Sequence, residues 1–206
     1  MMDGLRKFSD IVVYNLLFVI CSVPVITAGA SLLALCEGMQ KLSADKNADF
    51  PVAATFFGTF RRNFKRATVL WIWTVVGFLF LYLLQYATLS VSGGSQGTMY
   101  MASFVVVVLL LVFGYQHLFP VAARWQELSA IEVIVRSYLV AGASLFWTIM
   151  GICATSLISG ITLSLNPFVV PLGLMFWIFC GFGVTTYVCS GCFQKAAEKF
   201  ERKMGE

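Results

Sequence analysis

The stretch that decides the fold covers residues 11–36 and reads IVVYNLLFVICSVPVITAGASLLALC, without a charged side chain. A continuous helix over these residues would be about 39 Å long at about 1.5 Å per residue, whereas the hydrocarbon core of a bilayer is about 30 Å thick. Asn15 is polar, and Pro24 removes a backbone donor and clashes with the preceding turn. Thr27 and Gly29 follow in a short series of small residues. The pattern predicts a membrane helix that is kinked or broken at Pro24.

The composition of the whole chain indicates the same class of protein. Hydrophobic residues make up 59% of the sequence and charged residues only 12%, whereas soluble proteins are about 45–50% apolar and about 25% charged. The sequence therefore predicts an all-α integral membrane protein, folded as a compact helix bundle in a single domain over residues 1–206. The net charge of +4 gives no reason to expect a nucleic-acid partner. The lipid bilayer is the partner that the composition implies.

The apolar runs predict about five transmembrane helices, followed by a charged C-terminal tail at residues 194–206. The predicted segments are 11–35, 67–89, 99–123, 137–162 and 168–192. With five crossings, most Lys and Arg residues lie on the side of the C-terminus, which the positive-inside rule places in the cytoplasm, with the N-terminus outside. A second arrangement has the chain reverse between Pro24 and Gly29. The first stretch is then a re-entrant hairpin, and all 14 Lys and Arg residues share one side.

An amphipathic helix is predicted at residues 53–66, in the polar connection before the second span. Its aromatic side chains occupy one side and its basic side chains the opposite side, as in segments that lie in the interface of an anionic leaflet. Three interpretations stay open: an anchor that sets orientation, a docking surface for a partner, and a specific lipid-binding site. The residues are Phe56, Phe60 and Phe64 on the aromatic side and Arg61, Arg62, Lys65 and Arg66 on the basic side.

The predicted spans contain no Asp, Glu, Lys or Arg residue, and ion-coupled transporters usually need one. His117 is the single histidine, and we expect it to be an interfacial or capping group. Gln85 is expected to form hydrogen bonds between helices. The sequence shows no nucleophile–base arrangement, phosphate-binding loop or cluster of metal ligands. We therefore expect neither enzyme activity nor a metal or other cofactor.

Three motifs stand out in the sequence: NLLFVICSVPVITAGA (15–30), FFGTFRRNFKRATVLWIW (56–73) and LFPVAARW (118–125). They resemble the YesL-like family of bacterial multi-pass membrane proteins, which carry a domain of unknown function. Their order and spacing fit across nearly the whole chain. The family pattern often has an acidic residue near the end of the second helix, where this chain has Gln85. The resemblance implies a plasma-membrane protein of unestablished activity, with no established functional residues to transfer.

Members of that family are often encoded beside carbohydrate uptake systems and sensor pairs. The resemblance therefore suggests an accessory or regulatory component of carbohydrate uptake, whose partner is a carbohydrate ABC importer or a sensor protein. The alternative comes from the broken first helix, because discontinuous helices line the binding sites of many transporters. On that interpretation the chain is a small facilitator or channel-like transporter that acts on its own.

Overall fold

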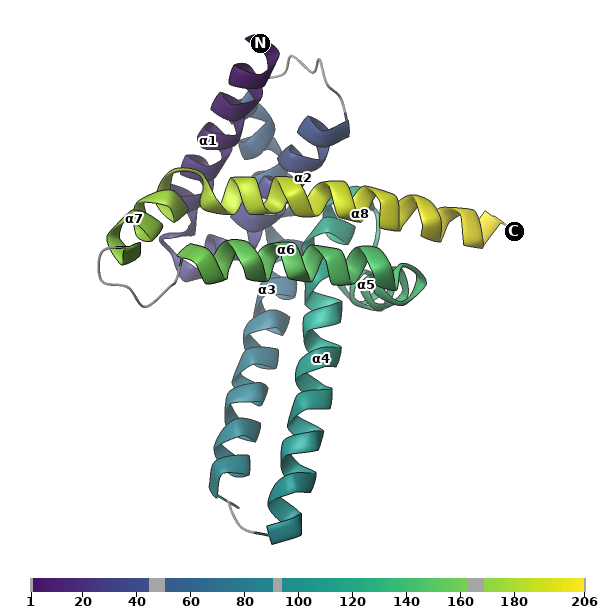
Figure 1. The fold of residues 1–206 in the computed structure, drawn as a ribbon. Helices are drawn as coiled ribbons and strands as arrows, with labels where there is room; N and C mark the ends of the chain where they lie inside the picture. The colour runs from purple at the N-terminus through teal and green to yellow at the C-terminus, as the bar shows by residue number, and fades with distance from the viewer. Residues whose placement is uncertain (1, 45–50, 91–93, 163–168, 206) are drawn as a thin grey trace.

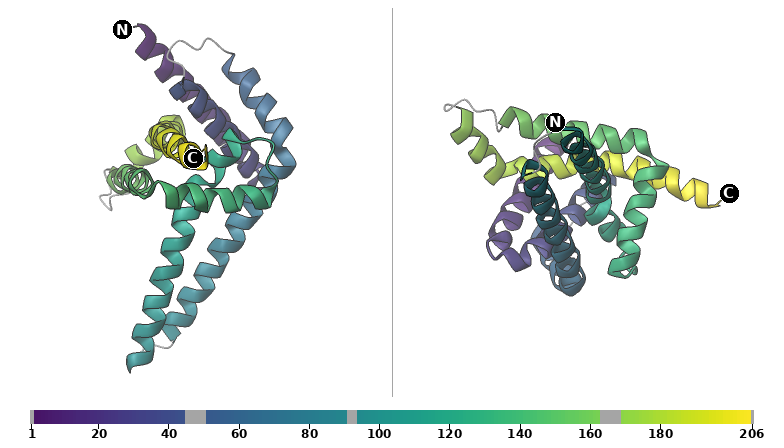
Figure 2. Two further views of the ribbon diagram at one scale, coloured as in Figure 1. Left: turned by 90° about the vertical axis from the view of Figure 1, so that its right-hand side faces the viewer. Right: turned by 90° about the horizontal axis from the view of Figure 1, so that it is seen from below.

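The computed structural model describes residues 2–44, 51–90, 94–162 and 169–205, and these residues form helices and short turns without a strand. This confirms the all-α class. Figure 1 shows a long antiparallel hairpin of α3 (Val52–Ser90) and α4 (Gly94–Arg124), whose far half projects from the rest of the molecule. Two side-by-side helices, α6 (Leu145–Thr162) and α8 (Phe182–Gly205), run across this hairpin in Figure 1 and are seen nearly end-on in the left view of Figure 2.

The first apolar stretch forms two helices that pack antiparallel. Helix α1 (Met2–Ser22) is followed by a short 3₁₀-helix, η1 (Val25–Thr27), and then by α2 (Ala28–Ala44). The hydroxyls of Ser22 and Ser31 are 2.7 Å apart, and Lys7 Nζ donates to the carbonyl of Leu42 at 3.4 Å. The first pair joins the end of α1 to the start of α2, and the second joins the start of α1 to the end of α2. The chain must therefore reverse direction between the two helices. The expected single span at 11–35 is therefore replaced by a helical hairpin.

Pro24 and Thr27 shape the reversal between these two helices. Pro24 is the N-cap of the 3₁₀-helix, with an extended backbone. The hydroxyl of Thr27 donates to the carbonyls of Cys21 at 2.6 Å and of Pro24 at 2.7 Å. The bond to Cys21 satisfies a carbonyl at the end of α1, whereas the carbonyl of Pro24 also accepts from the backbone N–H of Thr27 at 2.9 Å. The turn also carries exposed apolar side chains, with Val23 78% and Val25 68% exposed.

Helix α2 lies at the centre of the molecule, and most of its residues are buried. Its glycines permit this close packing. A Cβ atom at Gly29 would collide with Trp71 of α3, and one at Gly38 would collide with the ring of Tyr14 in α1. Small residues let helix backbones approach closely, so this helix can contact neighbours on several sides.

Three other predicted boundaries differ from the observed ones. The amphipathic helix at 53–66 and the span at 67–89 form one continuous helix, α3. The span at 137–162 consists of α5 (Ala130–Ala143) and α6, which are bent by 100° relative to each other. The segment at 168–192 contains α7 (Val169–Phe176), a π-helix, η2 (Trp177–Gly181), and then α8. Helix α8 continues through the expected C-terminal tail.

The bend between α5 and α6 has a local cause at Ser144. Its hydroxyl donates to the carbonyl of Val140 at 2.6 Å, and the hydroxyl of Thr148 donates to the carbonyl of Ser144 at 3.2 Å. The same two carbonyls also keep their backbone donors, so the break lies in the backbone of Ser144 itself, with φ −133° and ψ 48°.

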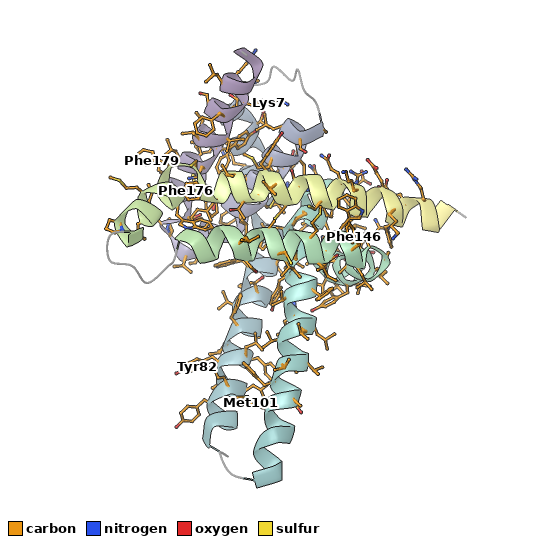
Figure 3. The ribbon with its side chains drawn as sticks, viewed as in Figure 1. Lys7, Tyr82, Met101, Phe146, Phe176 and Phe179 are labelled. Carbon is orange, nitrogen blue, oxygen red and sulfur yellow. The ribbon has the colours of Figure 1, made fainter. Side chains whose placement is uncertain are left out.

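Among the described residues, three helical segments are long and apolar enough to cross a membrane: Val52–Ala87, Met101–Arg124 and Gly173–Arg202. The number is four if the bent pair of α5 and α6 counts as one span. The expected number of about five is not reached, since the first stretch folds back on itself. The exposed apolar side chains also fit a membrane protein. Tyr82 and Met101 lie on the projecting hairpin, Phe146 lies on α6 and Phe179 on η2 (Figure 3).

Candidate functional site

The aromatic side of the predicted amphipathic helix packs into the protein. Phe56 is fully buried, and its ring centroid lies 6.2 Å from that of Tyr14 in α1. Phe60 lies between Phe56 and Phe64 along the helix, with centroid distances of 6.4 and 5.7 Å. These three rings therefore attach the first part of α3 to the rest of the molecule, whereas an interfacial helix would present them to lipid.

The basic side of the same helix divides into two groups. Arg61, Arg62 and Lys65 are exposed, and we call these three residues the basic face. Arg66 instead turns toward the end of α4, where its guanidinium donates to the carbonyls of Ala122 at 2.7 Å and Trp125 at 3.0 Å and also to that of Gln126. A helix leaves its last carbonyls without intrahelical donors, so Arg66 caps α4 and has a structural role.

Glu37 connects the basic face to the interior. Its side chain is only 6% exposed and accepts from Lys41 Nζ at 2.7 Å and from Gln126 Nε2 at 3.0 Å. Arg62 Nη2 lies 3.4 Å from the same carboxylate. This buried charge thus joins α2, α3 and the turn after α4, and it holds Arg62 in place. In the sequence, Glu37 directly follows the first apolar stretch. The Glu–Lys spacing of four residues is a signal that would have placed it on a helix.

Asn15, the polar residue of the first stretch, binds the backbone of the C-terminal region. Its Nδ2 donates to the carbonyls of Trp177 at 3.2 Å and Ile178 at 2.7 Å, and its Oδ1 accepts from the backbone N–H of Gly183 at 2.8 Å. The two carbonyls belong to the π-helix η2, and Gly183 follows it. Because these bonds occupy both ends of the amide and Asn15 is fully buried, Asn15 links two parts of the fold and does not line an open path.

His117 and Gln85 lie in different surroundings. His117 is buried, its Nε2 is 2.9 Å from the hydroxyl of Thr148, and its ring lies 5.8 Å from that of Phe193. It therefore connects α4 with α6 and α8 in the interior, whereas an interfacial position was expected. Gln85 is exposed on the projecting half of α3. The structure does not bring it together with His117 or with the basic face.

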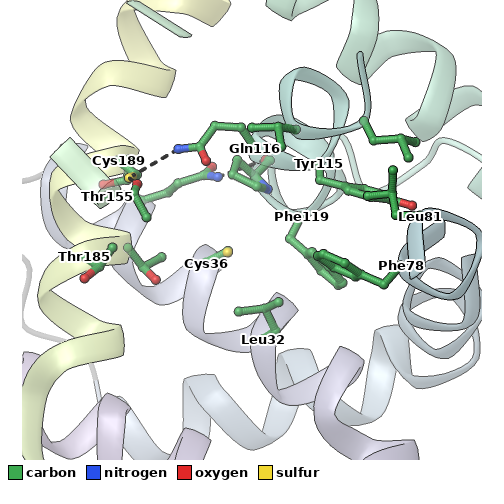
Figure 4. A pocket seen from close by; sticks show the side chains of 16 residues that line it. Leu32, Cys36, Phe78, Leu81, Tyr115, Gln116, Phe119, Thr155, Thr185 and Cys189 are labelled. Carbon is green, nitrogen blue, oxygen red and sulfur yellow. Dashed lines mark hydrogen bonds between the residues drawn. The ribbon is translucent and has the colours of Figure 1, made fainter. Parts of the chain in front are cut away.

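A cavity of about 350 Å³ lies where the α3–α4 hairpin meets α2, α6 and α8. Figure 4 shows Phe78 and Leu81 on one side and Thr155, Thr185 and Cys189 on the other. Its volume falls at the lower end of the range of about 300–1,000 Å³ that is usual for ligand pockets. Sequence reasoning did not find this cavity because its walls come from five helices. The lining residues are Leu32, Cys36, Gln40, Phe78, Leu81, Leu111, Val112, Tyr115, Gln116, Phe119, Pro120, Thr155, Thr185, Thr186, Cys189 and Ser190.

The polar groups of the cavity are uncharged. Gln116 Nε2 donates to Cys189 Sγ at 3.5 Å, and Thr155 Oγ1 lies 3.3 Å from the same sulfur. Gln40 Nε2 donates to the carbonyl of Pro120 at 2.9 Å. The described residues contain no group of three or more His, Cys, Asp or Glu side chains that could hold a metal ion. The chemistry available in the cavity is thus neutral hydrogen bonding beside apolar contact.

Comparison with known families finds one match. Residues 11–83 match the family described as "Protein of unknown function, DUF624", a range that covers the second half of α1, all of α2 and most of α3. YesL-like proteins belong to this family, so the match supports the resemblance at the level of a domain of unknown function. No curated protein and no solved structure matches the chain.

Proposed function

We propose that the chain is a non-enzymatic, YesL-like protein of the plasma membrane that serves as an accessory or regulatory component of carbohydrate uptake and docks a partner through its basic face. The observation that carries this proposal is the position of Arg61, Arg62 and Lys65. Because the aromatic side of their helix is buried against α1 and α2, these charges are held on a fixed outer surface. Burial of Phe56 removes one reason to interpret the helix as a plain membrane anchor.

The partner that fits this surface carries acidic side chains. Complementary charges at an interface speed association and exclude partners of the same sign. Arg62 adds a bidentate donor for a carboxylate, and its contact with Glu37 fixes its direction. A subunit of a carbohydrate ABC importer or a sensor protein is the proposed class of partner.

We propose a cytoplasmic position for the basic face and for the C-terminus. Residues 67–123 contain no charged side chain, so the hairpin of α3 and α4 can cross the bilayer and return. The positive-inside rule then favours the cytoplasm for both ends of this hairpin. The antiparallel pairing of α1 and α2 places the start of α1 beside the end of α2. This pairing favours the re-entrant arrangement, with the N-terminus on the same side.

The test is a mild-detergent pull-down of the tagged full chain from its own host, with stoichiometry by mass spectrometry. The test variant carries Arg61→Glu and Lys65→Glu. The control carries Lys199→Glu and Arg202→Glu, which make the same change in net charge at two exposed positions near the end of α8. We expect near-equal amounts of an importer subunit or a sensor protein with the wild type and the control, and loss of that partner with the test variant. Retention of the partner by both variants, or its absence from the wild type, would contradict the proposal.

The second candidate function is a small facilitator, and the cavity between α2, α3, α4, α6 and α8 is the observation that favours it. Proteoliposomes that contain the purified chain would then show flux of a sugar or an ion above that of empty vesicles. Equal flux in both kinds of vesicle, over a panel of sugars and ions, would remove this candidate. Asn15 does not support this candidate. Its amide is already hydrogen-bonded to the backbone at the π-helix and is therefore not available to line a path for a substrate.

A further inference from the structure

The cavity lies among helices that can cross a membrane. Its walls include Phe78 of α3, Leu111 of α4 and Thr185 of α8. Each of these residues belongs to one of the three segments that are long and apolar enough to span a bilayer. Phe78, at the wall, is also 60% exposed on the outside of the fold. A ligand of this cavity would therefore come from the hydrocarbon region of the membrane.

The two sides of the cavity differ in chemistry. The hairpin contributes a mostly apolar wall with Phe78, Leu81 and Leu111, and its polar groups there are Tyr115 and Gln116. The side built from α6 and α8 carries hydroxyl and thiol groups, among them Thr155 and Thr185 (Figure 4). None of the lining residues is charged. A ligand with a hydrocarbon chain and a small, neutral, polar end matches both sides.

Thr185 contributes a hydroxyl that the fold does not use. Its Oγ1 is buried and has no hydrogen-bond partner among the described residues. Thr68 and Thr155 show the usual helical arrangement, in which the hydroxyl donates to the carbonyl four residues earlier, at 2.8 Å in both cases. The carbonyl four residues before Thr185 belongs to Gly181, the last residue of the π-helix η2. Single-turn π-helices occur often at functional sites, and here the irregular turn coincides with an unpaired donor.

Pro120 adds a free acceptor to the same cavity. It lies inside α4 and has no backbone N–H, so the carbonyl of Gln116, four residues earlier, lacks its usual intrahelical donor. Two other polar groups of the lining have partners within the protein: Ser190 donates to the carbonyl of Tyr187 at 2.7 Å, and Gln40 donates to that of Pro120. The cavity thus combines the unpaired hydroxyl of Thr185 with a carbonyl, that of Gln116, to which Pro120 cannot donate.

We propose that this cavity binds a neutral lipid whose head is a free hydroxyl group, the chemistry shared by diacylglycerols and long-chain alcohols. A hydroxyl accepts a hydrogen bond from Thr185 and donates one to the carbonyl of Gln116, while the hydrocarbon chain lies against Phe78 and Leu81. A phospholipid with a charged head would have to bury an unpaired ion. A sugar would leave most of its hydroxyl groups unpaired against the apolar side.

The experiment uses the full chain in proteoliposomes and a diacylglycerol with a diazirine group on one acyl chain. A phosphatidylglycerol with the same labelled chain is the matched charged probe. After illumination, mass spectrometry quantifies the labelled peptides of α4 and α8. The variant Thr185→Val removes the hydroxyl and keeps the shape, Thr185→Ser restores a hydroxyl, and Thr68→Val is the control outside the cavity. Unlabelled diacylglycerol, hexadecanol and glucose are added as competitors.

We expect labelling by the diacylglycerol probe at least about ten-fold above that by the charged probe. Loss of one neutral hydrogen bond should lower the apparent affinity of Thr185→Val about five-fold, whereas Thr185→Ser and Thr68→Val should bind as the wild type does. Competition by diacylglycerol alone, or also by hexadecanol, tells which lipid is preferred. Equal labelling by both probes, unchanged binding by Thr185→Val, or displacement by glucose would overturn the proposal. Because partner docking rests on the basic face, the Arg61→Glu, Lys65→Glu variant should bind the diacylglycerol probe as the wild type does.

Discussion

Replacement of Asn15 by leucine, a side chain of similar size without the amide, should clearly destabilise the protein. Asn15 is fully buried and makes three hydrogen bonds to the backbone at the π-helix η2, at 2.7, 2.8 and 3.2 Å. Leucine would leave the carbonyls of Trp177 and Ile178 and the N–H of Gly183 without this partner.

The expected cost follows from these three bonds. A buried polar group that loses its partner costs about 1–3 kcal/mol. The bond of 3.2 Å lies at the long end of the usual range, so the two shorter bonds should account for most of a total of about 3 kcal/mol. In a chain of this length, about 1 kcal/mol shifts Tm by about 2–4 °C. We therefore expect Asn15→Leu to lower Tm by about 6–12 °C.

Asn63→Leu is the matched control for this substitution. Asn63 is also buried, but its amide makes one bond, of 3.4 Å, to the carbonyl of Thr59 in its own helix. We expect its Tm to change by less than about 2 °C. Thermal unfolding in detergent, followed by tryptophan fluorescence, measures both variants, and Trp177 lies beside the site. A shift for Asn15→Leu no larger than that for Asn63→Leu would refute the reasoning.

The remaining predictions concern helix ends, helix contacts and sidedness. Arg66→Met should lower Tm by about 4–8 °C because the carbonyls at the end of α4 lose their donor, while exposed Lys65→Met should change it by less than about 2 °C in the same thermal assay. Gly38→Ala should speed limited proteolysis, since the added Cβ would collide with Tyr14. At Gly58 an added Cβ would meet no atom within 4 Å, so Gly58→Ala should instead stabilise α3 by up to about 1 kcal/mol. Equal rates of proteolysis for Gly38→Ala and Gly58→Ala would contradict the packing argument. Protease added to inside-out vesicles should remove tags from both termini, and protection of either tag would contradict the proposed sidedness.

The class of the protein could be predicted because it depends on composition. The number of spans could not be predicted from the sequence. An apolar run of a given length can form one spanning helix, or it can form two antiparallel helices that bury the same residues against each other. Ser22 and Ser31 meet only once the chain has reversed. The bend at Ser144 depends on the backbone angles of that one residue. Neither feature alters the hydropathy of the segment in which it occurs.

The candidate surfaces were predicted in part. The opposite placement of Phe56 and Arg61 on one helix was visible in the sequence, but the sequence did not show which side the protein would bury. One available signal was missed: Ser129 and Glu132 form a capping box, with Ser129 N–H donating to the glutamate at 2.7 Å, and this pattern marks the start of α5. The cavity and the buried position of Glu37 depend on contacts between helices that are distant in the sequence. No local sequence pattern therefore predicts them.

The crossing of the α3–α4 hairpin by α6 and α8 has a consequence for the bilayer itself. A membrane has one normal, and helices that run across each other cannot all stand along it. If the hairpin stands along that normal, as the proposed sidedness requires, α6 and α8 run along the plane of the membrane and the apolar segment Gly173–Arg202 does not cross it (Figure 2). The molecule is then broad where α6 and α8 lie and narrow at the far half of the hairpin (Figure 1). A protein broader at one face of the bilayer than at the other would be expected to bind flat and curved membranes differently.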